Sequence, residues 1–307
     1  MSTLLLSSNL QWVLVSTLVL GIAAGLVGCL SYWKKHGLMS DALAHAALPG
    51  VVLAFLLFGE KHIAVLISGA AVSAFIGAWF IQTIRASTRI TEDTSMGIIL
   101  SVFYGFGIML LTIANRTAGG NQSGLDNFIF GQAAAMVRSD MYTMIGLSIV
   151  VIFLIYLLFK EWKLFLFDPS FAQGSGFSIK GMSALYMILL VTVIVIGIQA
   201  VGVILIAALL IIPPVSARYW TKSFHWMLLL SAGIGGIAGA GGTLISAMGS
   251  SWPTGPFIVI AAALIFVFSL LFGKEKGISV KFLQFKYHQR RMGYKEVNAH
   301  FPSKGVN

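Results

Sequence analysis

Long apolar stretches separated by short polar ones run through most of the chain. A bilayer core about 30 Å thick requires about 20 consecutive apolar residues in a helix. Five stretches meet this length, and each ends at charged residues or at clusters of Gly and Asn. The pattern therefore predicts membrane helices at residues 11–33, 38–58, 63–84, 94–114 and 141–159.

Two longer apolar stretches follow. Residues 223–273 contain only His225 as a charged or titratable side chain, and this stretch divides at 248–256, "MGSSWPTGP", because Pro and Gly end helices there. Residues 181–217 contain no Asp, Glu, Lys or Arg over 37 positions. That length exceeds one span but leaves little room for two.

The positions of the basic residues favour two crossings in 181–217. With a break near Gln199 to Gly202, seventeen of the twenty Lys and Arg lie on one side of the membrane, whereas a single crossing leaves thirteen. Basic residues concentrate on the cytoplasmic side of membrane proteins. We therefore predict nine passes with the N-terminus outside. A re-entrant half-helix, with eight full spans and the opposite N-terminal side, is the alternative.

Composition supports an integral membrane protein. Of the 307 residues, 58% are hydrophobic and 10% charged, and the mean hydropathy is +0.91, values that exclude an ordinary soluble domain. Residues 1–33 have no Asp, Glu, Lys or Arg, so the basic region of a cleavable signal is missing and a first membrane helix is expected. Cys29 is the single cysteine, which excludes an intrachain disulfide and a Cys-based zinc site.

The net charge of +10 is concentrated near the C-terminus. Eight of the twenty Lys and Arg lie in the last 34 residues, and 278–292 has the pattern of a basic amphipathic helix on the anionic inner leaflet. This distribution favours an orienting tail over a nucleic-acid groove. We predict a transmembrane domain at 1–273 and a basic cytoplasmic tail at 274–307.

A short surface helix is predicted at 169–173. Asp168 is a good N-cap, Pro169 suits the first helical position, and Gly174 and Gly176 can end the helix. The segment is either an interfacial turn or a protein-docking element. Farther along, Gly235 and Gly239 have the GxxxG spacing that lets helices approach closely, most simply within one chain.

Asp41 and His45 form the most unusual polar pair. Their spacing of four places both on one helix face, and an unpaired carboxylate inside a bilayer costs about 3 kcal/mol. Pro49 removes the hydrogen bond to the carbonyl of His45, so we expect a kink there. The pair could bind a divalent cation, pair structurally with each other or with Lys34 and Lys35, or relay a proton.

Two ligands per chain are too few for a firmly held transition metal. Either other residues or a second copy of the chain must complete such a site. The sequence also has no G-x-x-x-x-G-K-[ST] motif, so a partner would have to hydrolyse any ATP that drives the protein.

Several stretches together resemble the metal-ion permease subunits of bacterial ATP-binding-cassette (ABC) importers. The similarity runs in order from residue 37 to residue 218, and its first and last stretches are the most specific. The matching stretches are "GLMSDALAHAALPGVVLAFLL" (37–57), "TEDTSMGIILSVFYGFGIMLL" (91–111), "GLDNFIFGQA" (124–133), "FDPSFAQGSG" (167–176) and "VGVILIAALLIIPPVSAR" (201–218).

The resemblance implies an all-α bundle of eight to nine membrane helices, like type II ABC importers, in the bacterial cytoplasmic membrane. It implies that Asp41 and His45 bind the transported metal together with the same pair from a second permease protomer, identical or paralogous. A coupling helix at about 168–177 would dock on a cytoplasmic ATPase, and an extracytoplasmic solute-binding protein would deliver the metal. The coupling residues would be Asp168, Pro169, Ser170, Phe171, Ala172, Gln173 and Gly174.

Oxygen and nitrogen donors without thiolate favour manganese first, then zinc or ferrous iron, as cargo, and no resident cofactor is expected. Two other classes remain open. A proton-coupled secondary transporter would use Asp41 and His45 without an ATPase. An intramembrane metalloenzyme would need a third ligand and a base, for which the sequence has no H-E-x-x-H or comparable set.

Overall fold

The computed structural model describes residues 8–58, 63–117, 136–249 and 252–279. These residues form helices joined by short connections, and no strand occurs among them. The helices are α2 (Ser8–Trp33), α3 (Met39–Phe58), α4 (Ile63–Ser87), α5 (Glu92–Thr117), α7 (Arg138–Leu157), α8 (Phe159–Phe167), α9 (Pro169–Gly174), α10 (Ile179–Val201), α11 (Val203–Arg218), α12 (Phe224–Ser246) and α13 (Thr254–Phe272).

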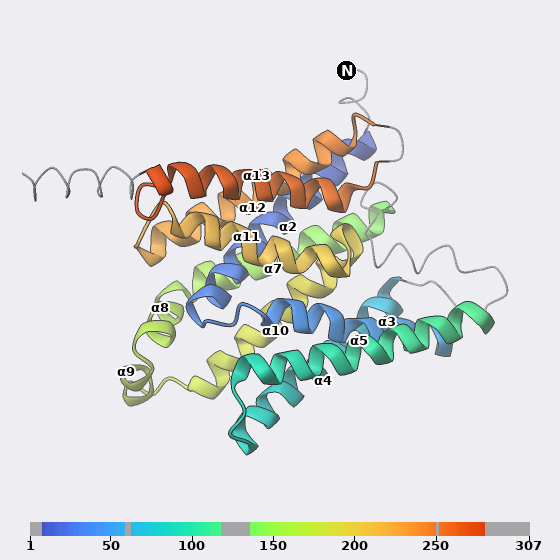
Figure 1. Ribbon diagram of the computed structural model, residues 1–307, viewed down its shortest axis with the longest axis horizontal. Helices are drawn as coiled ribbons and strands as arrows, with labels where there is room; N and C mark the ends of the chain where they lie inside the picture. Colours follow the sequence, from blue (N-terminus) through green and yellow to red (C-terminus); the bar gives the residue numbers. More distant parts are fainter. Residues whose placement is uncertain (1–7, 59–62, 118–135, 250–251, 280–307) are drawn as a thin grey trace, which may run out of the picture.

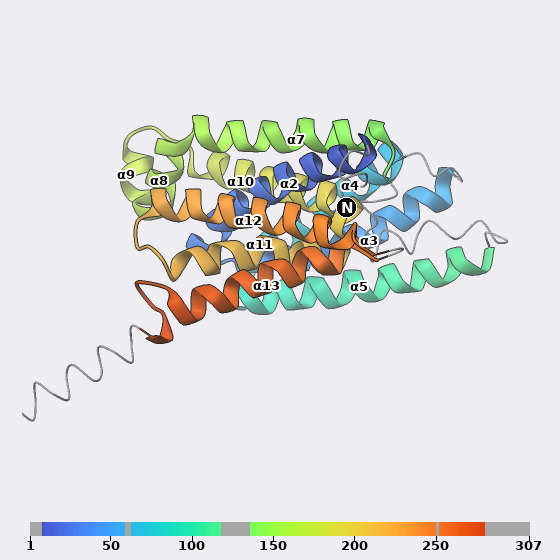
Figure 2. The ribbon, with the colours of Figure 1, turned by 90° about the horizontal axis from the view of Figure 1, so that it is seen from above.

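The long helices run along one common direction, and α8 and α9 lie together at one end of the bundle (Figures 1 and 2). Trp33, at the end of α2, marks this end through its ring contacts with Phe167 of α8 and Phe224 of α12. Basic side chains gather here, so the positive-inside rule makes it the cytoplasmic end. They are Lys34, Lys35, Arg85, Arg89, Lys160, Lys163, Lys180, Arg218, Lys222, Lys274 and Lys276.

Eight of the described helices are long and apolar enough to cross a membrane: α2, α3, α4, α5, α7, α10, α12 and α13. They begin and end close to the predicted stretches, because span length is set by the bilayer and is therefore visible in the sequence. The predicted division of 223–273 is confirmed, since α12 ends at Ser246 and α13 begins at Thr254.

The chain reverses at Gly202, where the predicted break lies. This glycine has φ +97° and ψ 162°, a conformation that other residues rarely adopt. Ile206 packs on Gly197 across the turn, which a continuous helix would forbid. The returning helix α11 has 16 residues, about 24 Å at 1.5 Å per residue, and is shorter than the other spans. It nevertheless reaches the cytoplasmic end, where the Arg218 guanidinium lies 5.5 Å from the Trp33 ring centroid.

The predicted GxxxG contact lies within the chain, between α12 and α2. A Cβ added at Gly235 would meet the carbonyl of Gly21, so the two backbones touch there. Two buried hydrogen bonds flank the contact: the Ser231 hydroxyl donates to the Gly25 carbonyl at 2.6 Å, and the hydroxyls of Thr17 and Thr243 lie 2.9 Å apart. Small residues thus allow close helix packing in a medium that gives little hydrophobic driving force.

One prediction was wrong. The sequence predicts no helix between the span at 141–159 and the short helix at 169–173, but the structure has α8 from Phe159 to Phe167. Trp162 and Phe165 are buried under this helix while Lys163 is exposed. The stretch is therefore an amphipathic surface helix, too short and too charged to resemble a span. Most of the predicted amphipathic segment 278–292 lies outside the described residues.

Candidate functional site

Asp41 and His45 lie together near the start of α3. The distance between Oδ1 of Asp41 and Nε2 of His45 is 3.5 Å, and 35% and 14% of the respective side chains are exposed. Lys34 does not pair with Asp41: its Nζ lies 4.7 Å from the ring centroids of both Phe165 and Tyr186. The side chains of Asp41 and His45 lie on one face of the helix, as their spacing predicted. Both can therefore turn toward one shared ligand.

The Tyr104 ring of α5 contacts the His45 ring at about half the depth of the bundle. The two ring centroids are 4.8 Å apart in an edge-on arrangement, and Nδ1 of His45 is buried with no hydrogen-bond partner among the described residues. Tyr104 lies twelve residues after the start of α5, about 18 Å along that helix. No pattern in the sequence indicates this contact, because it depends on how α5 is rotated against α3.

The backbone of α3 is held from the side opposite Asp41. Gly50 follows Asp41 by nine residues, which is half a turn around the helix axis, and Gly50 touches the backbone of Gly69 on α4. The Ser73 hydroxyl of α4 donates to the Ala46 carbonyl at 2.6 Å. Helix α3 runs unbroken through Pro49, and the kink expected at this residue stays a prediction. The Asp41 and His45 pair thus stands on a closely packed helix.

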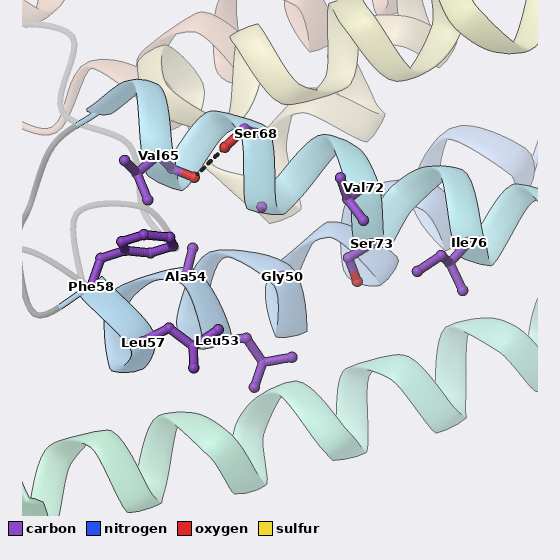
Figure 3. Close-up of a pocket in the computed structure, with 11 residues that line it drawn as sticks. Gly50, Leu53, Ala54, Leu57, Phe58, Val65, Ser68, Val72, Ser73 and Ile76 are labelled. Carbon is purple, nitrogen blue, oxygen red and sulfur yellow. Dashed lines mark hydrogen bonds between the residues drawn. The ribbon is translucent and has the colours of Figure 1, made fainter.

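Asp41 and His45 are too few to hold a transition metal on their own. Among the described residues, no group of three or more His, Cys, Asp or Glu side chains could hold a metal ion. The groove between the outer halves of α3 and α4, 290 Å³ in volume, adds no free donor (Figure 3). Both of its serine hydroxyls already donate hydrogen bonds within the protein. Ser68 donates to the Val65 carbonyl at 2.8 Å, and Ser73 donates to the Ala46 carbonyl.

The short helix α9 forms as predicted, with its last residue at Gly174. The Asp168 carboxylate accepts hydrogen bonds from the Phe171 amide at 3.0 Å and from the Ser170 hydroxyl at 3.3 Å, which satisfies the N-terminus of the helix. Gly176 has φ +87° just after it. Ala172 is buried, whereas 61% of Phe171 is exposed at the cytoplasmic end. An apolar ring is therefore presented outside the bundle.

A partly buried ionic cluster was not predicted from the sequence. The Glu92 carboxylate lies 2.7 Å from Nε2 of His36 and 3.0 Å from Nη1 of Arg85. Burial, together with the neighbouring charges of Lys34 and Arg85, lowers the pKa of His36 to about 3. The imidazole is therefore neutral and donates from Nε2 to Glu92. Burial also lowers the pKa of Lys34 to about 8 against the opposing effect of Glu92.

The arrangement of helices and motifs agrees with comparisons to known proteins. Residues 7–273 match the model of a family described as the ABC 3 transport family. The chain belongs to this family. It is a multi-pass membrane permease of the ABC type.

Two curated relatives of this ABC 3 transport family member are named as membrane proteins of metal transport systems. The chain is 42% identical over 289 residues to the manganese transport system membrane protein MntC of Bacillus subtilis, covering 94% of this chain and 66% of that protein. It is 40% identical over 270 residues to the zinc transport system membrane protein TroC of Treponema pallidum, covering 88% and 91%.

A solved structure has the same fold. In the complex titled PsaBC from Streptococcus pneumoniae with Fab, one chain superposes with a TM-score of 0.78 at 32% identity, covering 93% of this chain and 98% of the other. The all-helical fold is therefore shared with a chain of that experimentally determined complex.

Proposed function

We propose that this permease moves a divalent transition-metal cation into the cytoplasm of a bacterium, with manganese as the first candidate and zinc or ferrous iron next. The observation that carries the proposal is the pair of Asp41 and His45, 3.5 Å apart on a rigidly packed helix inside the membrane. A carboxylate and an imidazole suit a cation of borderline hardness. The manganese and zinc names of the relatives favour the same cargo.

The site requires a second permease protomer. Two donors per chain leave a transition metal under-coordinated, so two Asp41 and His45 pairs would meet as a four-residue cage on the axis of a dimer. Separation of the two pairs would open the cage and weaken the binding. Alternation between outward-open and inward-open dimers then moves the cation across.

A separate cytoplasmic ATPase drives the transport of the cation and docks on the coupling helix. The exposed Phe171 ring and the capped start at Asp168 support this role for residues 168–177. A rigid, solvent-facing apolar anchor is the usual form of a docking hot spot. A solute-binding protein would deliver the metal at the opposite end of the bundle.

Uptake into proteoliposomes tests the proposal. The permease is reconstituted with its ATPase and binding protein, and manganese uptake is measured with and without ATP. We expect Asp41→Ala and His45→Ala to abolish ATP-dependent uptake while the complex still assembles. Asp93→Ala and His225→Ala are matched controls, because both side chains are exposed at the cytoplasmic end and away from the pair. Wild-type uptake by both site variants would refute the site.

The same vesicles separate the importer from a proton-coupled transporter. The permease alone, without ATPase, is placed under a pH gradient in either direction. We expect no manganese uptake, because the site has no energy source of its own. Uptake driven by the gradient would instead assign Asp41 and His45 to proton coupling.

A further inference from the structure

A second groove lies between α4 and α10 at the cytoplasmic end. Its volume is 680 Å³, and it is separate from the Asp41 and His45 pair. No Asp or Glu lines it. The lining residues are Phe75, Ala78, Trp79, Gln82, Ile179, Lys180, Ser183, Ala184, Met187 and Ile188.

The groove changes from polar to apolar with depth. On α4, Gln82 lies seven residues closer to the cytoplasmic end than Phe75, and on α10, Lys180 lies seven residues closer than Met187. Seven helical residues span about 10 Å along the membrane normal. The polar side chains therefore lie at headgroup level, and the apolar ones reach toward the acyl chains.

The charge at the polar end is positive. Lys180 lines the groove and forms no ion pair among the described residues. Arg85 continues the α4 face one turn beyond Gln82, with 58% of its side chain exposed and one nitrogen bound to Glu92. A basic pocket between membrane helices at the cytoplasmic surface is a typical site for an anionic headgroup.

The groove faces away from the proposed dimer contact. Helix α4 touches α3 through Gly69, and Ala78 of the groove follows Gly69 by nine residues, half a turn around α4. Trp79 is 62% exposed beside it, and exposed Trp side chains concentrate at the membrane interface. A second protomer that covers Asp41 and His45 would leave this surface in contact with lipid.

We propose that the α4–α10 groove binds one anionic phospholipid of the inner leaflet. The headgroup phosphate contacts Lys180, Gln82 and Ser183, and an acyl chain lies along Phe75, Met187 and Ile188. The apolar part of the groove favours a lipid over free phosphate, because inorganic phosphate has no apolar surface to bury there. The site does not depend on which ion the permease carries. Its headgroup end lies beside the four-residue connection from α9 to α10.

Native mass spectrometry of the permease–ATPase complex tests the site. Complexes are stripped of lipid in detergent and titrated with phosphatidylglycerol or phosphatidylcholine. We expect Lys180→Ala to weaken phosphatidylglycerol binding about fivefold, the factor that one basic residue contributes at an anionic surface, and to leave phosphatidylcholine binding unchanged. Lys163→Ala is the charge-matched control, because Lys163 is exposed on α8 outside the groove.

A filling variant tests the acyl half independently. Ala184→Trp should remove the phosphatidylglycerol adduct without loss of the assembled complex, because the indole occupies the volume of the acyl chain. Equal binding of both lipids by the wild type, or unchanged phosphatidylglycerol binding in both Lys180→Ala and Ala184→Trp, would overturn the proposal.

Photo-crosslinking identifies what covers the groove in the membrane. A benzoyl-phenylalanine at position 79 replaces the exposed Trp79 in the complete complex. We expect covalent lipid adducts after irradiation. A crosslink to the ATPase or to the second permease protomer would instead assign the groove to a protein interface and refute lipid binding.

Discussion

Nε2 of His36 lies 2.7 Å from Oε1 of Glu92, so the connection after α2 is joined to the first turn of α5. The second Glu92 oxygen binds Arg85, at the end of α4. One carboxylate thus links the cytoplasmic ends of the helices that precede and flank α3. The connection that carries His36 leads directly into α3, the helix that carries Asp41 and His45.

The first prediction concerns pH. The folded pKa of His36, about 3, lies below the ordinary value of 6.5. The unfolded chain therefore binds the extra proton first, and folding stability falls as pH drops below about 6.5. By linkage, the loss at pH 5 is about 2 kcal/mol per chain. Thermal unfolding in detergent between pH 7.5 and pH 5 measures it.

His36→Gln is the control for that prediction. Glutamine can still donate to Glu92 but does not titrate, so the pH dependence in this range should become flatter. If the variant and the wild type lose stability in parallel, another group is responsible.

The second prediction concerns the contact between α2 and α12. Gly235→Leu forces a side chain into the carbonyl of Gly21 and should destabilise the fold by about 3 kcal/mol, as overpacking does. The readout is the unfolding temperature in detergent. Gly233→Leu is the matched control, because nothing lies within 4 Å of a Cβ at Gly233. Equal losses in both variants would mean that the close contact is not the cause.

The third prediction concerns stoichiometry. If two Asp41 and His45 pairs form one cage, the assembled transporter should bind one manganese ion per two permease chains. Elemental analysis after equilibrium dialysis measures the ratio, and Asp41→Asn, with one charge removed from each half, should bring it close to zero. A ratio of one ion per chain would contradict the shared cage.

The fourth prediction concerns coupling. Phe171→Asp should abolish co-purification of the ATPase, because a charge replaces the exposed ring on α9, while manganese binding is retained. Ile278→Asp places the same charge on another exposed apolar side chain at the cytoplasmic end and should leave the ATPase bound. Retention of the ATPase by Phe171→Asp would exclude α9 as the docking element.

The sequence alone predicted the spans well, because their length is fixed by the membrane. It also located the turn at Gly202, where charge distribution and a glycine agreed, and the Asp168 cap, which acts within three residues. Helix α8 was missed because Trp162 and Phe165 are interspersed with Lys and Glu in a stretch too short to span.

The site was predictable only in part. The spacing of Asp41 and His45 follows from helix geometry, so their proximity could be expected. Tyr104 against His45 depends on the rotation of a separate helix, and His36, Arg85 and Glu92 come from three different connections or helix ends. Such contacts are set by tertiary packing, which no local pattern contains.

The reversal at Gly202 also decides in which compartment new domains can be attached. Because α11 returns to the cytoplasmic end, α2 begins on one side of the bundle and α13 finishes on the other, where Glu275 binds Lys222 and the Tyr219 carbonyl. An ATPase fused after α13 would share the compartment of α9, whereas one fused before α2 would be separated from ATP by the membrane. Because of the reversal at Gly202, a fused ATPase must follow α13 and cannot precede α2.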